Sequence, residues 1–360
     1  MLTAAPPLVA ALVTLVTGAL LAALAPRLGW SDGPGALGGR KRQGTPVPTV
    51  GGAALLLGLA AGWALFDAAG RVPEALTPGR GLGRLLTPWL GATATLFPLG
   101  ACCVAFLVGL ADDLLPGGLR PRTKVLGQAL AGCVLGAPLL ASTVVPTSAA
   151  LAVLVAFALG AIAAANLLNT FDNADGAAGA LGLLGLAATS PLLAAPVAGF
   201  LPLNLLCRAR ADQPAARVPL TYLGDAGSHL LGVLILITPA AWPVLLIPAL
   251  DLGRLSVLRV RSGSRPWVGD RRHLAHRLEQ RKLSRLAVPA LLAALAAPAL
   301  LATWMLAWPW ALLGGALTTG LFAAAVAWTS DPGPEPVAPA SGRAGAGGGA
   351  SPAGLLSGEQ

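Results

Sequence analysis

Charged residues are scarce in this chain. They make up 11% of its 360 residues, whereas hydrophobic residues make up 55% and the mean hydropathy is +0.74. An ordinary soluble domain carries about 25% charged residues, so the composition excludes a soluble globular protein. It predicts a chain that lies largely within a membrane.

Cysteine is also rare. The four cysteines, Cys102, Cys103, Cys133 and Cys207, all lie in apolar runs, where a free thiol behaves as a small hydrophobic group. The pattern indicates neither a disulfide framework nor a zinc site. No motif recurs along the chain, and residues 1–25 lack the basic start and cleavage site of a secretory signal. We therefore expect residues 1–25 to be a retained first span.

Long apolar stretches recur along the sequence, and a membrane-spanning helix needs about 20 such residues. They predict an all-α bundle of 11 spans, with 10 as the near alternative because prolines leave two of the divisions open. The predicted spans are 5–25, 49–66, 89–110, 125–141, 147–166, 177–191, 192–207, 228–240, 241–258, 286–303 and 306–328. Residues 1–330 form one predicted domain, and the Gly- and Pro-rich segment 331–360 is predicted to be a disordered tail.

Basic residues predict the orientation, because cytoplasmic loops carry the excess of Lys and Arg. With the N-terminus outside, most basic residues fall in inward loops, the largest of which spans about 254–285. The sequence pI of about 10.6 reflects these basic loops. On a membrane protein such loops suit anionic lipid head groups, so no nucleic-acid partner is expected.

Five short polar clusters interrupt the apolar chain, and all five fall on the predicted cytoplasmic side. Polar side chains beside membrane spans are costly, so their recurrence on one side indicates one shared site. The clusters are the basic segment 40–42 with Gly51 and Gly52, Asp112 and Asp113 with Lys124, residues 166–176, residues 222–229, and residues 266–278. A positive-inside loop before a packing glycine pair would explain the first cluster by itself.

The second cluster ends one apolar run and begins the next. Asp112 and Asp113 repel one another, so they stay ionised only beside a cation or a metal ion. A helical hairpin would bring Lys124 close to them. An interfacial acid pair that merely ends a helix explains the same pattern.

The third cluster is more specific. In a helix, the three-residue spacing of Asn166, Asn169 and Asp172 places their side chains approximately on one face. Asp175 repeats the step, and Gly176 then permits a turn. Oxygen ligands of this kind suit Mg²⁺, which is shared between a few protein oxygens and substrate phosphates. A polar helix C-terminus is the simpler explanation, but it does not readily account for four such residues beside a buried span.

The last two clusters add an acid and several cations. Glycines on both sides of Asp225 let a ligand approach its carboxylate, although Ser228 is equally explained as a helix N-cap. Arg272, His273 and His276 combine groups that bind phosphate. A basic amphipathic segment lying on anionic lipid explains this last cluster as well.

Taken together and in order, the motifs resemble those of the polyprenyl-phosphate N-acetylhexosamine-1-phosphate transferases of glycosyltransferase family 4, over about residues 40–285. The matching patterns are Pro-x-x-Gly-Gly, Gly-x-x-Asp-Asp with a following Lys, Asn-x-x-Asn-x-x-Asp-x-x-Asp-Gly, Gly-Asp-x-Gly-Ser and Asp-Arg-x-His-x-x-His. The resemblance implies a plasma-membrane enzyme that moves a sugar 1-phosphate from a UDP-N-acetylhexosamine to undecaprenyl or another polyprenyl phosphate. The reaction would take place in a polar cleft at the cytoplasmic face and release UMP. It would be an initiating step of cell-envelope glycan synthesis.

The resemblance also implies residue roles. Asn169 and Asp225 would hold Mg²⁺, for which Mn²⁺ is the alternative, on the diphosphate. Asp112 and Asp113 would orient or deprotonate the lipid phosphate, while Lys124 steadies its charge. The other implied site residues are Asn166, Asp172, Asp175, Gly176 and Tyr222 near the nucleotide, and Arg272, His273 and His276 at the diphosphate. The expected catalytic set is Asp112, Asp113, Lys124, Asp225 and His273. Direct displacement by the lipid phosphate is expected, rather than an aspartyl intermediate.

The last motif favours one branch of this family. Residues 270–273 resemble the branch that uses UDP-GlcNAc or a related hexosamine, and a phospho-MurNAc-pentapeptide transferase is the alternative. The favoured branch usually has a further histidine where this chain has Ala275. A non-catalytic relative that binds lipid phosphate or nucleotide therefore stays open, as does compensation by His229. A secondary transporter is disfavoured because the acids lie at predicted helix ends. The sequence leaves a homodimer open.

Overall fold

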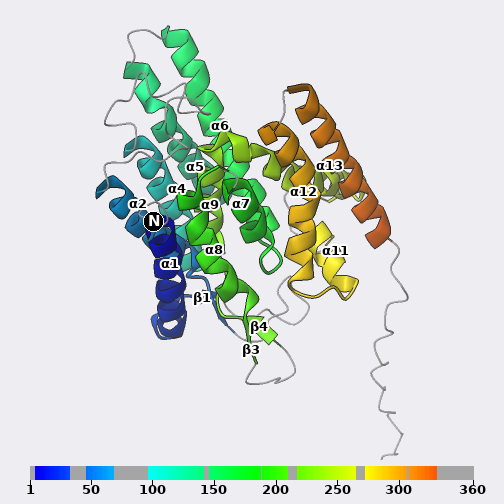
Figure 1. Ribbon diagram of the computed structural model, residues 1–360, viewed down its shortest axis with the longest axis horizontal. Coiled ribbons are helices and arrows are strands. Elements are labelled where there is room, and N and C mark those ends of the chain that lie inside the picture. Colours follow the sequence, from blue (N-terminus) through cyan, green and yellow to red (C-terminus); the bar gives the residue numbers. More distant parts are fainter. Residues whose placement is uncertain are drawn as a thin grey trace, which may run out of the picture.

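The computed structural model describes residues 5–32, 46–68, 96–141, 146–187, 189–209, 217–264, 272–305 and 308–330. Most of these residues are helical (Figure 1). The α-helices are α1 (Ala5–Leu24), α2 (Gly51–Ala68), α4 (Leu96–Leu114), α5 (Pro121–Gly136), α6 (Thr147–Phe171), α7 (Ala177–Ala187), α8 (Pro191–Leu205), α9 (Gly224–Leu236), α10 (Leu246–Arg261), α11 (Leu274–Gln280), α12 (Ala287–Met305) and α13 (Trp308–Thr329). Shorter 3₁₀ helices are η1 (Ala25–Leu28), η4 (Ala137–Ala141) and η5 (Pro239–Leu245).

The apolar helices agree with the predicted membrane fold. Seven helices in the described ranges are long and apolar enough to cross a membrane: Ala5–Leu28, Leu96–Leu114, Pro121–Leu140, Thr147–Phe171, Pro239–Arg261, Ala287–Trp304 and Pro309–Thr329. Shorter apolar helices cover Gly51–Phe66, Ala177–Ala187, Pro191–Leu205 and Gly224–Leu236. Each predicted segment therefore contains an apolar helix, and the all-α, multi-pass fold is confirmed.

Four of the 11 predicted spans, those that contain α2, α7, α8 and α9, hold only shorter apolar helices, and several helix ends differ from the predictions. Helix α7 has 11 residues and is about 16 Å long at 1.5 Å per residue, so it is shorter than a full span. The predicted inward loop 254–285 begins as helix, because α10 continues to Arg261 and α11 occupies part of the remainder. The predicted basic segment 40–42, the motif residues 265–271 and the predicted tail 331–360 lie outside the described residues.

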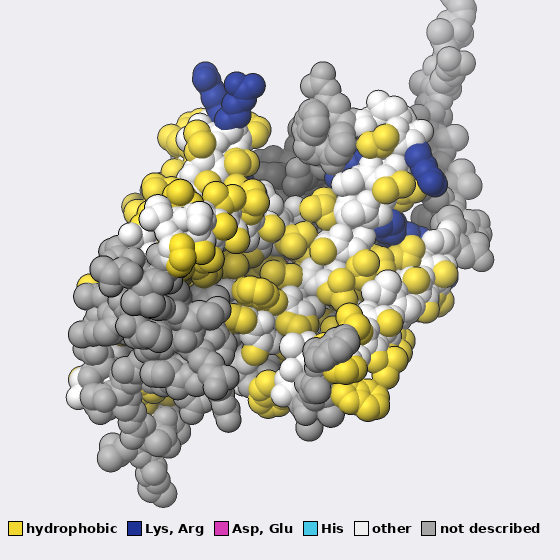
Figure 2. Space-filling view, turned by 90° about the horizontal axis from the view of Figure 1, so that it is seen from above, with side chains coloured by type: hydrophobic (Ala, Val, Ile, Leu, Met, Phe, Trp, Pro, Cys, Tyr) yellow, Lys and Arg dark blue, Asp and Glu magenta, His cyan; other side chains and the backbone are white. Residues whose placement is uncertain are grey.

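Apolar side chains cover the outside of the bundle as well as its interior. Figure 2 shows hydrophobic side chains over most of the coloured surface of one face, with lysines and arginines in a few separate places. Trp310 and Trp328 are exposed near opposite ends of α13, about 27 Å apart along the helix axis. Because tryptophan favours both membrane interfaces, and the hydrocarbon core is about 30 Å thick, this spacing is that of a full span.

Helix α9 lies at the centre of the bundle. Its residues Ala226–Leu236 are all buried, and it packs against α2, α4 and α6. A Cβ atom added to Gly109 of α4 would lie 2.3 Å from the Asp225 carbonyl oxygen, and one added to Gly52 of α2 would lie 2.3 Å from the Gly227 nitrogen. Glycine therefore lets both helices approach the N-terminus of α9 closely.

Two antiparallel strand pairs hold the inter-helix connections: β1 (Ser31–Asp32) with β2 (Val47–Pro48), and β3 (Cys207–Ala209) with β4 (Arg217–Pro219). Backbone hydrogen bonds then join the end of β2 and the start of α2 to the residues before α9. Tyr222 N–H donates to the Pro48 carbonyl at 2.8 Å, and Gly51 N–H donates to the Tyr222 carbonyl at 3.0 Å. The starts of α2 and α9 are therefore held side by side.

Candidate active site

Lys124, in the first turn of α5, is the centre of the candidate site. Its Nζ donates to Asp112 Oδ2 of α4 at 3.0 Å and also pairs with the Asp225 carboxylate of α9. The side chains of Lys124, Asp112 and Asp225 are 20%, 18% and 24% exposed. These groups are therefore partly desolvated, which strengthens their pairing, yet a ligand can still reach them.

Helix α6 contributes Asn169 to the same point. Its Nδ2 donates to Asp225 Oδ1 at 2.6 Å and to Ser228 Oγ at 3.1 Å. We refer to Asp112, Lys124, Asn169, Asp225 and Ser228 as the Asp225 cluster. It joins the consecutive helices α4, α5 and α6 to the distant helix α9, and both oxygens of its central carboxylate accept hydrogen bonds.

Asp113 has a different environment from its neighbour Asp112. Its two oxygens accept the backbone N–H groups of Asp225 and Ala226, both at 3.0 Å. Helix α9 has Leu223 at its N-cap position and no capping side chain of its own, so Asp113 caps it from α4. A carboxylate at a helix N-terminus satisfies free N–H groups and interacts favourably with the helix dipole. The contacts of Asp113 are thus those of a residue that positions Asp225.

Asp112 fixes the turn after α4. Its Oδ1 accepts the Leu119 N–H at 2.8 Å, while Oδ2 bonds Lys124. Gly117 and Gly118 have φ values of 82° and 72°, a left-handed conformation that glycine adopts at little cost. The two adjacent acids therefore avoid a shared environment: one pairs with Lys124 and the other with backbone N–H groups.

A buried polar row lies one helical turn from the cluster. Asn166 Nδ2 donates to Gln128 Oε1 at 2.7 Å, and Gln128 Nε2 lies 3.1 Å from His229 Nε2. Gln128 and His229 are buried. His229 therefore bonds α5 inside the bundle, and not the α11 segment that holds Ala275.

The acids after α6 take different partners. Desolvation, with the negative charges of Asp225 and Asp113, raises the pKa of Asp172 well above its usual range. Asp175 instead forms an ion pair with Arg285, just before α12. Helix α6 ends at Phe171, so Asp172 and Asp175 no longer follow one helical face, and they lie in different surroundings.

Gly176 turns the chain into α7. Its φ is 75°, and its N–H donates to Asn204 Oδ1 at 2.5 Å. Asn204 Nδ2 in turn donates to the Thr221 carbonyl at 3.0 Å. This buried asparagine of α8 therefore ties the turn after α6 to the segment that contains Tyr222.

The histidine segment is held by α10. His273 Nδ1 lies 2.8 Å from Asp251 Oδ2, and the Arg272 carbonyl accepts a hydrogen bond from Arg254. His276, one turn into α11, pairs instead with Glu279 at 3.0 Å. The two histidines therefore have separate partners.

Ala275 faces the hydrophobic core and is 0% exposed. A histidine at this position would have to enter the packing between α11 and its neighbours. The alanine therefore does not leave a gap in the polar surface of the segment.

Sequence reasoning did not single out Asp251, Asn204 or Arg285. Asp251 and Asn204 stand alone in apolar runs, and a lone acid or amide in a predicted span is itself a signal, because burying it without partners is costly. Arg285 stands at the end of the predicted inward loop 254–285 with nothing in the sequence to mark it, and its pairing with Asp175 depends on the tertiary fold.

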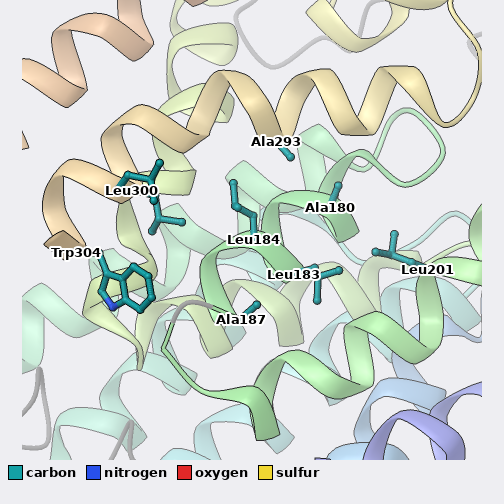
Figure 3. Close-up of a pocket in the computed structure, with 9 residues that line it drawn as sticks. Ala180, Leu183, Leu184, Ala187, Leu201, Ala293, Leu300 and Trp304 are labelled. Carbon is teal, nitrogen blue, oxygen red and sulfur yellow. The ribbon is translucent and has the colours of Figure 1, made fainter. Parts of the chain in front are cut away.

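A cavity of about 520 Å³ lies between α7, α8 and α12. Figure 3 shows its lining, which includes Leu184, Leu201 and Trp304. All nine lining residues are apolar or aromatic. The lining has the chemistry for a hydrocarbon chain, and none of the Asp225 cluster residues belongs to it.

The Asp225 carboxylate and the Asn169 amide contain oxygens of the type that bind a hard cation, although Lys124 and the Asn169 nitrogen occupy the carboxylate here. A half-turn of the Asn169 amide would present its oxygen beside the Asp225 carboxylate. Mg²⁺ commonly uses one or two protein oxygens together with substrate phosphates. The described residues contain no group of three or more His, Cys, Asp or Glu able to hold a metal, so such a cation would depend on the substrate for other ligands.

Residues 95–241 match the family model described as glycosyl transferase family 4. The matched segment runs from α4 into η5 and contains the whole Asp225 cluster, whereas the His273 segment lies beyond it. No curated protein matches the chain. The match supports, in general terms, a transferase that acts on polyprenyl phosphate and a nucleotide sugar.

Proposed function

We propose that the chain belongs to glycosyl transferase family 4 and transfers N-acetylglucosamine 1-phosphate from UDP-N-acetylglucosamine to a polyprenyl phosphate. UMP is the second product, and the reaction begins a cell-envelope glycan at the cytoplasmic face of the plasma membrane. The observation that carries this proposal is the meeting of four helices at the Asp225 cluster inside the matched segment.

The reaction joins two anions. An oxygen of the lipid phosphate attacks the β-phosphorus, the bond from that phosphorus to the bridging oxygen breaks, and UMP leaves with the electron pair. Such a step needs alignment and charge neutralisation more than covalent help. A phosphate monoester has a second pKa of about 6, so the nucleophile is already largely ionised at neutral pH and needs no strong base.

Lys124 supplies the cation for the lipid phosphate in this scheme. Asp112 holds its Nζ in place, and the partial exposure of both side chains leaves room for a phosphate oxygen. Asp113 keeps the N-terminus of α9, and hence Asp225, in position. Because the oxygens of these acids already accept hydrogen bonds, we favour direct attack by the lipid over an aspartyl intermediate.

Asn169 and Asp225 would hold Mg²⁺ or Mn²⁺, which when bound supplies positive charge to the diphosphate. The remaining roles follow from the resemblance of the motifs. On that basis Asn166, Asp172, Asp175, Gly176 and Tyr222 would bind the nucleotide, and Arg272, His273 and His276 would bind the diphosphate.

The test is UMP release by purified protein in detergent, with undecaprenyl phosphate, Mg²⁺ and a panel of UDP-sugars. We expect release that requires the lipid phosphate and occurs with UDP-N-acetylglucosamine. Asp225→Asn should abolish it, whereas Cys103→Ala, at an exposed position of α4, should not. Release only with UDP-MurNAc-pentapeptide would assign the chain to the other branch. No release from folded protein would favour a non-catalytic relative.

A further inference from the structure

Asp251 is a buried carboxylate outside the Asp225 cluster. It lies in α10 and is 0% exposed. Its oxygens accept hydrogen bonds from the Arg254 guanidinium at 2.8 Å, from His273 Nδ1 at 2.8 Å and from the Leu274 N–H at 3.2 Å. An apolar residue would be easier to bury at this position, because a charge removed from water must regain its hydration energy from partners.

The bond to His273 fixes the chemistry of the imidazole. An ionised carboxylate accepts a hydrogen bond but has no proton to donate, so the ring carries its proton on Nδ1. Nε2 is then left for a ligand, as a hydrogen-bond acceptor when the ring is neutral and as a donor when it is charged. The Leu274 contact fixes the backbone at the start of α11 as well. One carboxylate on α10 therefore holds both the His273 ring and the backbone at the start of α11.

From this geometry we infer that Asp251 is a positioning residue: it holds the His273 ring with its proton on Nδ1 and presents Nε2 to the diphosphate of the nucleotide sugar. The part concerning the diphosphate rests on the proposed function, whereas the ring geometry does not. Asp251 itself touches no substrate in this account.

A purely structural role is the competing explanation. Asp251 also neutralises Arg254, which donates to the Arg272 carbonyl, so its loss could act by loosening the junction between α10 and α11. Arg254→Gln separates the two roles, because it breaks the ion pair but leaves the carboxylate beside the ring.

The first measurement is the tautomer of His273 by ¹⁵N NMR of protein labelled at histidine. The chain has only three histidines, so the imidazole signals are few, and those absent from His273→Gln belong to His273. At a pH where the ring is neutral, we expect the proton on Nδ1 in the wild-type protein and in Arg254→Gln. A wild-type ring protonated on Nε2 would overturn the inference without any Asp251 variant.

The second measurement is a double-mutant cycle with Asp251→Asn and His273→Gln, read as turnover in the UMP-release assay. Removing the partner that orients a metal-bound histidine typically lowers activity by about 10- to 100-fold, and we expect a loss of similar size for Asp251→Asn. In the His273→Gln background the same substitution should have little further effect, because it acts through that ring. Full additivity would reject the positioning role.

The two measurements separate this inference from the proposed function. If the tautomer is as expected but no UDP-sugar releases UMP, the reaction is wrong and the ring geometry stands. If UMP is released while the wild-type ring carries its proton on Nε2, the proposed function stands and the role of Asp251 is wrong.

Discussion

Substitutions of Asp113 test whether this acid positions α9 or takes part in the reaction. Its two hydrogen bonds to the N-terminus of α9 are both 3.0 Å long. A hydrogen bond to a charged group contributes about 1.5–3 kcal/mol, so Asp113→Ala should destabilise the protein by about 3 kcal/mol or more. Asp113→Asn keeps one acceptor oxygen and should cost about half as much.

The assay measures the apparent Tm in detergent together with UMP release. We expect the Tm to fall in the order wild type, Asp113→Asn, Asp113→Ala, and turnover to fall in the same order as Asp225 loses its fixed position. If Asp113→Asn kept the wild-type Tm and lost all turnover, the carboxylate would have to act in the chemistry, and our assignment of a positioning role would be refuted.

Three further substitutions test the packing around the site. Gly109→Ala places a methyl group against the Asp225 carbonyl oxygen and should lower both Tm and turnover; an unchanged Tm would contradict the close approach of α4 to α9. Ala275→His should lower Tm and should not raise turnover, because position 275 is buried in the core; higher turnover would mean that the segment lacks a histidine it needs. Asn204→Leu removes the hydrogen bonds that join Gly176 to the residue before Tyr222. It should raise the KM for the UDP-sugar, measured by UMP release at varied donor concentration; an unchanged KM would show that these bonds do not support nucleotide binding.

The fold could largely be predicted from the sequence, because hydropathy alone decides which segments enter a membrane. The ends of the helices could not be predicted as well. The 3₁₀ helix η5 and α10 form one apolar run, and α10 continues past the predicted membrane boundary to Arg261. Hydropathy reports the loss of apolar character there, but not the end of the helix.

The site was predictable where residues repeat a spacing or flank a turn. Asp112, Lys124, Asn169 and Asp225 were expected together, and the structure places them in contact. The separate environments of the adjacent acids were not predictable, because they depend on which helix ends face α4. The partner of His273 was missed for the same reason, since Asp251 lies 22 residues away on another helix.

The most direct test of the central claim follows the phosphorus atoms. UDP-N-acetylglucosamine labelled with ³²P in the β position should pass its label to the polyprenyl lipid, whereas label in the α position should remain in UMP. Asp225→Asn, purified in the same way, should neither label the lipid nor release labelled UMP. Appearance of β-label in free UDP, with unlabelled sugar on the lipid, would show transfer of the sugar alone and contradict the account.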